Sequence, residues 1–318
     1  MCFCIFTKIK TTKKFPSLMK KLVVLFLISN LGFLSAQNYV DLLKINYSST
    51  PFNSYDSLNG IKTQLQEFST DITLPFVLDS TKTLLTGILF EQINLVNEPS
   101  GQSTFYTINP KIGLNYKHSE KVTGTYVFLP KIASDLQNRI NQKHFQFGGI
   151  ALFNIKKSEL FKYRVGAYFN QELFGPFVVP LLGFYYQSKN KKLEANFTLP
   201  VSADLNYEVA KNVKAGLNFN AIVKSFYASD FNNNYITKTT NELFGYLQFN
   251  FPSYRILIEP QVGYSVGRSY RIYKEDDKLD FKISAFKFGS DQKPLNYDFK
   301  DGLIFKIRLV YRFMLENK

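Results

Sequence analysis

The chain has two histidines, His118 and His144, and histidine is the usual base that activates a serine or a water molecule for hydrolysis. Ser119 follows His118 directly, but the two stand in a short polar segment that predicts a turn, and adjacent side chains of an extended chain point apart. His144 stands at the start of an expected strand, at the rim of the fold. No catalytic residue is assigned, and a lipid-modifying enzyme remains only an alternative.

Metal binding has less support than acid–base chemistry. Two histidines without a ligand spacing do not make a zinc site, and both cysteines, Cys2 and Cys4, stand at the start of the chain. The acidic run 274–278 is typical of a solvated loop, with a Ca²⁺ site that bridges lipopolysaccharide phosphates as the alternative. We expect neither a metal nor a cofactor.

Charged side chains recur at every second position of several segments, opposite apolar ones. In 303–313, Lys306, Arg308 and Arg312 share one face, while leucine, isoleucine and aromatic residues dominate the other. If such faces line an open channel, their positive charge would favour anionic solutes. If the interior is closed, the same residues form ion pairs that fill it. The candidate lumen-lining residues are Lys162, Arg164, Lys214, Lys224, Arg255, Glu259, Arg271, Lys306, Arg308 and Arg312.

The strands that position these residues are predicted by the alternation of apolar and polar residues. In 203–226 apolar residues occupy every second position on both sides of 210–212, which is the pattern of two strands joined by a tight turn. Alternation does not say which face meets water. A soluble sandwich hides its apolar face, whereas an outer-membrane barrel turns that face to lipid.

Strand number and loop length favour the barrel. Short and long connections alternate, as in barrels with short periplasmic turns and longer outer loops. Fourteen strands are expected. If 193–209 is one long strand rather than two short ones, twelve is possible, because such barrels usually have an even number of strands. The expected strands are 39–48, 62–77, 82–96, 105–117, 121–132, 143–156, 160–171, 176–188, 191–199, 201–209, 212–226, 236–251, 254–272 and 301–313, with 279–288 as a further strand inside a loop.

The first 36 residues have the features of a secretory signal peptide. They carry lysines and no acid, then the apolar run 22–34, then a small-residue exit at Ala36. The run is shorter than the roughly 20 residues of a membrane-spanning helix. Translation from Met19 would give a shorter leader of the same kind. The expected domains are therefore the signal peptide, 1–36, and one barrel domain, 37–318, without cysteine.

Net charge gives no sign of a nucleic-acid partner. The chain has 39 Lys and Arg against 25 Asp and Glu, a formal charge of +14. Six of those lysines lie in the leader, so the mature chain has 33 basic residues against the same 25 acids, or +8. The remaining basic residues are spread along the chain and form no basic stripe.

The last strand resembles the terminal signal that the barrel-assembly machinery recognises in outer-membrane proteins. It is amphipathic and ends in an aromatic residue, Phe313, with five residues after it. The abundance of Tyr (20) and Phe (32) fits aromatic girdles at the membrane interfaces, although the chain has no Trp. The expected partners are outer-membrane lipid, lipopolysaccharide and that assembly machinery.

Three segments resemble a family of outer-membrane β-barrels of unknown function that is common in Bacteroidota-type bacteria. They are YVFLPKIASDL (126–136), YRVGAYFNQELFGPFVVPLLGFYYQ (163–187) and FTLPVSADLNYEV (197–209). The resemblance covers roughly 38–313. It implies a fold and a membrane, and it implies no activity and no catalytic residue.

The sequence therefore predicts an all-β protein of the outer membrane, a transmembrane antiparallel up-and-down β-barrel with 12–14 strands, 14 being preferred. The first functional hypothesis is a passive porin-like channel or small-solute transporter with a basic lumen. The alternative is a structural or binding barrel with a filled lumen that acts through its outer loops, above all 273–300. The sequence names neither the solute nor the oligomeric state.

Overall fold

The computed structural model describes residues 39–54, 62–97, 101–229, 234–289, 291–297 and 299–314. These residues form strands and turns, with short 3₁₀ turns at η1 (Gln142–His144) and η3 (Pro252–Tyr254). The predicted signal peptide lies outside the described residues. The described part of the chain has no helix of the length and hydropathy that a membrane span requires.

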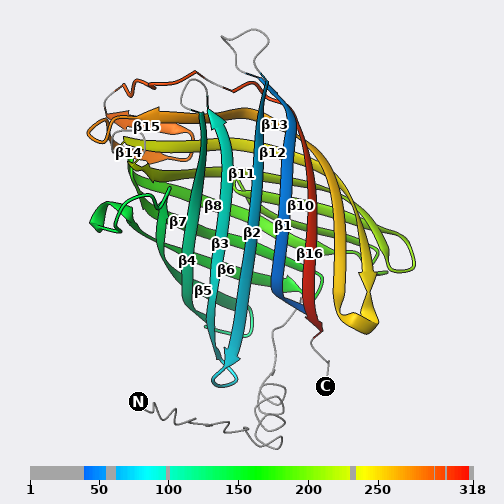
Figure 1. Ribbon diagram of the computed structural model, residues 1–318. Coiled ribbons are helices and arrows are strands. Elements are labelled where there is room, and N and C mark those ends of the chain that lie inside the picture. The colour runs from blue at the N-terminus through cyan, green and yellow to red at the C-terminus, as the bar shows by residue number, and fades with distance from the viewer. Residues whose placement is uncertain are drawn as a thin grey trace, which may run out of the picture.

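Fourteen strands close into one antiparallel barrel (Figure 1). Each strand pairs with its neighbours in sequence, and the last strand returns to pair with the first. The barrel strands are β1 (Tyr39–Ser54), β2 (Lys62–Val77), β3 (Lys82–Asn97), β4 (Gly101–Lys117), β5 (Val122–Ser134), β6 (Phe145–Ser158), β7 (Phe161–Glu172), β8 (Gly175–Gln187), β9 (Leu193–Leu199), β10 (Ser202–Ala210), β11 (Val213–Ala228), β12 (Asn234–Phe251), β13 (Ile256–Tyr273) and β16 (Leu303–Met314).

The predicted fold class is confirmed, and the preferred count of fourteen is the right one. The doubtful segment 193–209 is two strands, β9 and β10, because the chain turns back at Pro200. The further strand expected at 279–288 is a hairpin, β14 (Leu279–Ile283) and β15 (Phe286–Gly289), which pairs with β8 rather than standing alone.

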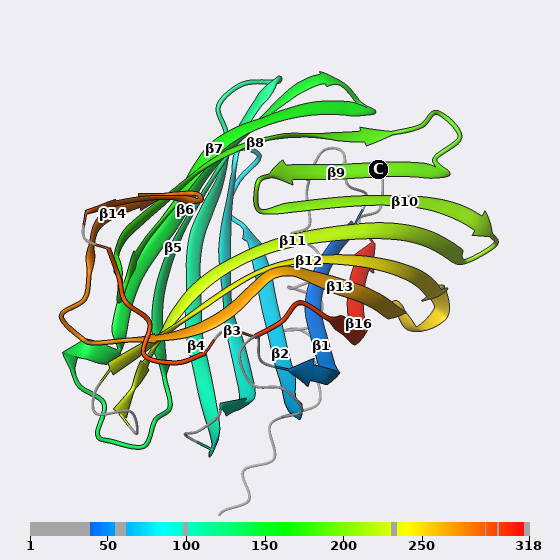
Figure 2. The same cartoon turned by 90° about the horizontal axis from the view of Figure 1, so that it is seen from above.

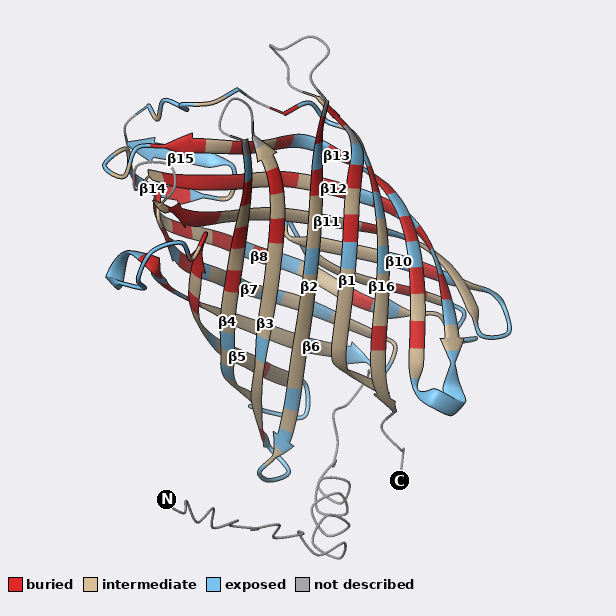
Figure 3. Cartoon of the chain, viewed as in Figure 1, coloured by how far each residue is buried: buried red, intermediate tan, exposed pale blue. Residues whose placement is uncertain are grey.

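The apolar face of each strand points outward. In β11, Leu217 is 61% exposed, whereas its neighbour Asn218 is 7% exposed. The alternation of exposed and buried residues is clearest along β12 and β13 (Figure 3), and exposed apolar residues on other strands include Leu74, Phe128 and Val165. A water-soluble barrel would turn the apolar side chains inward, so this outer band is a surface for lipid.

The two ends of the barrel differ in their connections. One end, the turn end, carries tight connections such as 78–81 and 211–212; the other, the loop end, carries the long ones, including 274–302. At the turn end, Asp79 closes its turn by accepting hydrogen bonds from the Thr81 amide at 2.7 Å and the Lys82 amide at 2.9 Å. Hydrogen bonds from the Thr81 hydroxyl and amide lower the pKa of the Asp79 carboxyl.

The loop-end parts of β11, β12 and β13 do not continue the wall but cross the mouth of the barrel (Figure 2). We call these parts, 221–228, 234–240 and 267–273, the inturned ends. Tyr227 of β11 pairs with Ser134 of β5, which lies almost opposite in the strand order. The bend in β13 begins at Gly267, whose φ of +65° a larger residue would adopt only with strain, and the β12–β13 register shifts there.

Both faces of the inturned ends are covered by apolar residues. One face, with Phe226, Ile236 and Ile272, forms a buried cluster with the inner wall of β2–β5. The other face, with Tyr235 and Tyr273, forms a second cluster with β7, β8 and β14. The mouth therefore contains a packed layer and is not an open ring.

Candidate functional site

The interior of the barrel can be recognised by hydrogen bonds between strands that are not neighbours. Lys224 of β11 lies 2.5 Å from a carboxylate oxygen of Glu91 on β3. The Tyr270 hydroxyl of β13 donates to Glu67 of β2 at 2.7 Å, and Lys238 of β12 pairs with the same carboxylate. Because these strands lie apart in the sheet, the bonds cross the lumen, and the residues that make them line it.

Most of the candidate lumen residues make ion pairs. Lys214 pairs with Glu194 at 3.1 Å, and Lys306 pairs with Glu242 at 3.1 Å. Two further pairs, Arg308 with Glu259 at 3.2 Å and Arg312 with Asp41 at 2.6 Å, lie between adjacent strands. The lumen is therefore lined by pairs of opposite charge rather than ringed by positive charge alone.

The remaining candidates differ in their surroundings. Arg164 of β7 donates to Asn154 at 3.0 Å and also bonds Asn196 and Thr198, so it is held by neutral groups. Lys162 lies on the same face of β7, half-buried.

Arg255 and Arg271 are not in the middle of the lumen. Arg255 is exposed, in the left-handed conformation that closes η3 at the turn end, and its guanidinium lies 4.9 Å from the centre of the Phe313 ring. Its assignment to the lumen is wrong because β13 begins one residue later, at Ile256. Arg271 lies beyond the bend at Gly267, among residues that line a cavity at the mouth.

Most of the acidic partners of these lysines and arginines were not among the predicted lumen residues. Each of four of them pairs with a lysine of a strand that is not its neighbour: Glu67, Glu91, Glu194 and Glu242. The available signal was their position, since each falls on the polar face of its own strand. Face assignment alone would have found them, but not their partners.

The turn end of the lumen is narrowed by a cross-barrel contact. The Tyr39 hydroxyl of β1 donates to Glu194 of β9 at 3.1 Å, and the guanidinium of Arg312 lies 3.5 Å from the centre of the Tyr39 ring. Glu194 also accepts from Lys214 at 3.1 Å. β1 and β9 lie nearly opposite each other, so this contact spans the lumen.

We expect Tyr39→Ala to raise single-channel conductance, because the substitution removes the ring and the hydrogen bond that span the turn end. The matched control is Tyr47→Ala on the same strand, whose ring is 44% exposed on the outer face. Planar-bilayer recordings compare the two. Equal conductance of both variants and the unchanged chain would mean that Tyr39 is not at the constriction.

Above this constriction the lumen contains a cavity of about 830 Å³. Its deep wall is polar, with Glu67, Glu91 and Arg308, and its wall toward β7 and β8 is apolar, with Tyr168 and Phe177. Cavities of this size hold small organic molecules, and the mixture of a few polar groups with apolar walls is typical of ligand sites.

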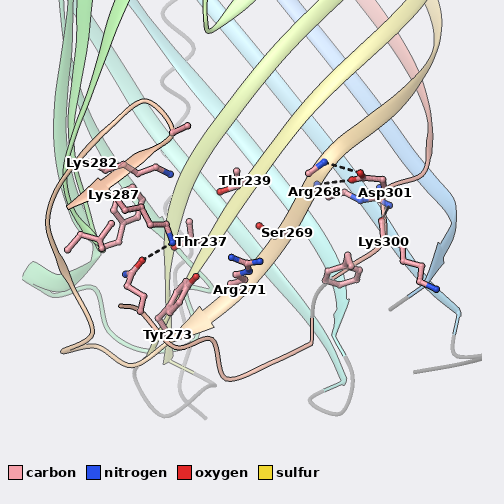
Figure 4. Close-up of a pocket in the computed structure, with 16 residues that line it drawn as sticks. Thr237, Thr239, Arg268, Ser269, Arg271, Tyr273, Lys282, Lys287, Lys300 and Asp301 are labelled. Carbon is pink, nitrogen blue, oxygen red and sulfur yellow. Dashed lines mark hydrogen bonds between the residues drawn. The ribbon is translucent and has the colours of Figure 1, made fainter. Parts of the chain in front are cut away.

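A second cavity, of about 480 Å³, lies at the mouth between β12, β13 and the β14–β15 hairpin (Figure 4). Basic side chains predominate around it: Arg271, Lys282, Lys287 and Lys300. Its carboxylate, Asp301, accepts from the backbone amides of Gly267 and Arg268 at 3.0 and 2.9 Å.

The two cavities share three lining residues, Thr239, Lys282 and Ala285. They therefore adjoin one another beneath the hairpin. The smaller cavity lies at the mouth, and the larger one, which we call the chamber, lies deeper in the lumen.

Both histidines make hydrogen bonds to nearby groups of the fold. His118 lies in the predicted turn, where its Nε2 is 2.8 Å from the Tyr126 hydroxyl, while Ser119 accepts from the Val122 amide at 3.1 Å. His144 is fully buried rather than at an open rim, because its Nδ1 accepts from the Asn141 amide and closes η1. Among the described residues, no group of three or more His, Cys, Asp or Glu is placed to hold a metal ion.

Comparisons with known proteins give a family and a likeness of fold. A family model described as Domain of unknown function (DUF6268) matches residues 33–312. A search of the curated proteins gave no match.

Among solved structures, an outer membrane channel from Pseudomonas putida F1 is 9% identical, with a TM-score of 0.45 over 89% of this chain and 98% of that chain. The TodX monoaromatic hydrocarbon channel, as a deltaS2 mutant, is 11% identical, with a TM-score of 0.39 over 90% and 94%. The NanC porin is 7% identical, with a TM-score of 0.35 over 85% and 98%. At these values the likeness is one of fold, and function has to be argued from the lumen itself.

Proposed function

The chain belongs to the DUF6268 family, a family of unknown function, and from this premise we propose that it is a passive outer-membrane channel selective for small solutes. The observation that carries the proposal is the chamber of about 830 Å³ inside a closed barrel whose outer face is apolar. A barrel that served only as a scaffold would gain from filling this space, since interior packing stabilises proteins. We assign no reaction to it.

Selectivity would come from the narrow, ion-paired lumen rather than from net positive charge. The cross-lumen pairs hold opposite charges within hydrogen-bond distance, so their fields largely cancel for a passing ion. We expect small conductance steps and weak ion selectivity, unlike those of a wide porin.

The test is planar-bilayer recording of the mature chain, residues 37–318, after refolding in detergent. Steady, small steps that scale with salt concentration support a channel. Silence from a folded, heat-modifiable barrel would refute it and favour the alternative, a barrel with a filled lumen that acts through its outer loops.

Removing one acid of a cross-lumen pair should change selectivity in a predictable direction. Glu91→Gln leaves the Lys224 ammonium without its carboxylate, so the lumen gains a net positive charge and we expect a shift toward anions. The reversal potential in a salt gradient measures the shift. Glu120→Gln, in an exposed turn, is the matched control and should leave that potential unchanged. An unchanged potential in Glu91→Gln would place Glu91 outside the conduction path.

We propose the outer membrane as the location, with lipid and lipopolysaccharide as the surroundings. The support is the apolar outer band together with the terminal strand β16, whose exposed Leu303, Phe305 and Ile307 alternate with the inward Ile304, Lys306 and Arg308. Such a strand is the element through which the barrel-assembly machinery would receive the chain.

A further inference from the structure

The wall of the barrel has a gap at the loop end, between β8 and β11. β9 pairs with β8 only from Leu182 down to Gln187, and β10 pairs with β11 only up to Asn220. Beyond these points β11 continues through 221–224, and then the Ser225 amide donates to Glu172 at the end of β7 and the Ser225 carbonyl accepts from Gln146 of β6. Neither β9 nor β10 reaches this level, because the chain turns back at Pro200.

The β14–β15 hairpin occupies part of this gap and is attached on one side only. β14 runs parallel to β8, with Lys282 opposite Phe177 and Ile283 opposite Val178. The Ser284 amide donates to the Val178 carbonyl at 2.9 Å. In the described part of the chain, neither strand of the hairpin pairs with β11.

The strand edges that border the gap leave few backbone groups to extend the sheet. The Val178 carbonyl points into the gap, so the alternation of a strand directs the nitrogens of Pro176 and Pro180 there too, and proline has no N–H to extend a sheet. On β11, the Ala221 amide donates to the Val201 carbonyl. Val223, the next residue on that edge, has no strand beside it in the described ranges.

The large chamber reaches this gap. Its lining includes Pro200 and Val201 at the turn between β9 and β10, and Ala221 and Val223 of the neighbouring β11. Ser284, at the tip of the hairpin, lines the same chamber.

The outer side of the gap lies beside lipid-facing residues. Val178 is in register with Phe169 of β7, which is 44% exposed on the outer wall. The hairpin carries exposed aromatic rings at Phe286 and at the stacked pair Phe281 and Phe288, whose centroids are 4.4 Å apart. An apolar surface at this position continues the outer band across the gap.

We propose that the gap between β8 and β11 is a side port through which a small amphipathic molecule passes between the chamber and the membrane, with the β14–β15 hairpin as its door. This rests on the proposed function for the chamber, and it names the substrate class. The apolar walls at Tyr168, Phe177 and Val223 suit an apolar body, and the charged floor at Glu91 and Lys224 suits a polar head group.

Access of lipid to the chamber can be measured with a single tryptophan, because the chain has none. Ile222→Trp places the indole in the chamber, in vesicles of phosphatidylcholine with brominated acyl chains that quench tryptophan on contact. We expect quenching clearly above that of Ser69→Trp, deeper in the same chamber, and below that of lipid-facing Leu217→Trp. Ser284→Trp is the second reporter if Ile222→Trp does not fold. Quenching no greater than that of Ser69→Trp would overturn the port.

Passage of a molecule through the gap can be tested by fixing the β14–β15 hairpin to β8 with a disulfide. Val178→Cys with Ile283→Cys joins two strand neighbours at a separation that suits a disulfide, in a mature chain that has no other cysteine. Cells that express the variant take up the apolar dye N-phenyl-1-naphthylamine, followed by its fluorescence. We expect oxidation to reduce uptake several-fold and a reductant to restore it.

Conductance of the same variant separates the two proposals. Conductance that is present in both redox states, with dye uptake that oxidation changes, supports the port. Conductance that is present, with dye uptake insensitive to oxidation, overturns the port and leaves the channel standing. Absent conductance with redox-sensitive dye uptake supports the port and overturns the ion-conducting lumen.

Discussion

Leu217→Arg is expected to prevent stable assembly of the barrel. Leu217 is 61% exposed on the outer face of β11, and a positive charge at the middle of the lipid layer costs about 2–4 kcal/mol. That cost is a large share of the stability of a folded protein. The measurement is the amount of heat-modifiable, protease-resistant barrel recovered after refolding into lipid vesicles.

The matched control is Asn220→Arg, three residues further along the same strand. Asn220 is half-buried on the inner face and lines the chamber, where water and carboxylates can solvate a guanidinium. This variant should assemble nearly as well as the unchanged chain. Equal recovery of the two variants would contradict the assignment of the outer face to lipid.

Glu172→Ala should destabilise the barrel by about 3–5 kcal/mol and loosen its mouth. Glu172 is fully buried at the end of β7, where it accepts from Lys131 of β5 at 2.8 Å and from the Ser225 amide of β11 at 2.8 Å. Removing the carboxylate leaves the buried Lys131 ammonium without its partner and releases an inturned end. Denaturant unfolding in detergent measures the first effect, and larger or noisier conductance steps measure the second.

Two controls separate the buried pair from charge loss in general. Lys156→Ala removes an ion pair in an exposed turn, with Glu159, and should cost no more than about 1 kcal/mol. Glu172→Gln keeps the side-chain shape and an acceptor for Ser225, so the mouth should remain more ordered than in Glu172→Ala. Similar unfolding midpoints for all three variants would rule out Glu172 as the anchor.

The wall of the barrel was predictable because period-two alternation is a local property. Each strand exposes one face to lipid and the other to a polar interior, so the pattern of 203–226 already contains both faces and the turn between them. The paired carboxylates were not predictable in the same way. Which lysine meets Glu91 depends on the register of strands that are far apart in sequence, and no local pattern specifies it.

The inturned ends were also beyond local patterns. The alternation of β12 and β13 continues through the bend, so the sequence predicts straight strands; only Gly267 marks the point where β13 turns. The gap in the wall had a visible signal at Pro200. This proline lies in the segment 193–209, for which the sequence allowed one strand or two. Its meaning depends on β8 and β11 extending past that turn, which is a relation among three strands.

The pairing of β1 with β16 makes folding of the barrel depend on its most distant contact. The hydrogen bond between Arg312 and Asp41 joins residues 271 positions apart. Contacts between residues so far apart in sequence form slowly. Closing the long loop between them costs conformational entropy before the contact contributes any stability. Until this seam forms, the edges of β1 and β16 remain open to pairing with other chains. A permuted chain that joined these two strands by a short turn would not remove the seam but would move it to the strands at its new ends.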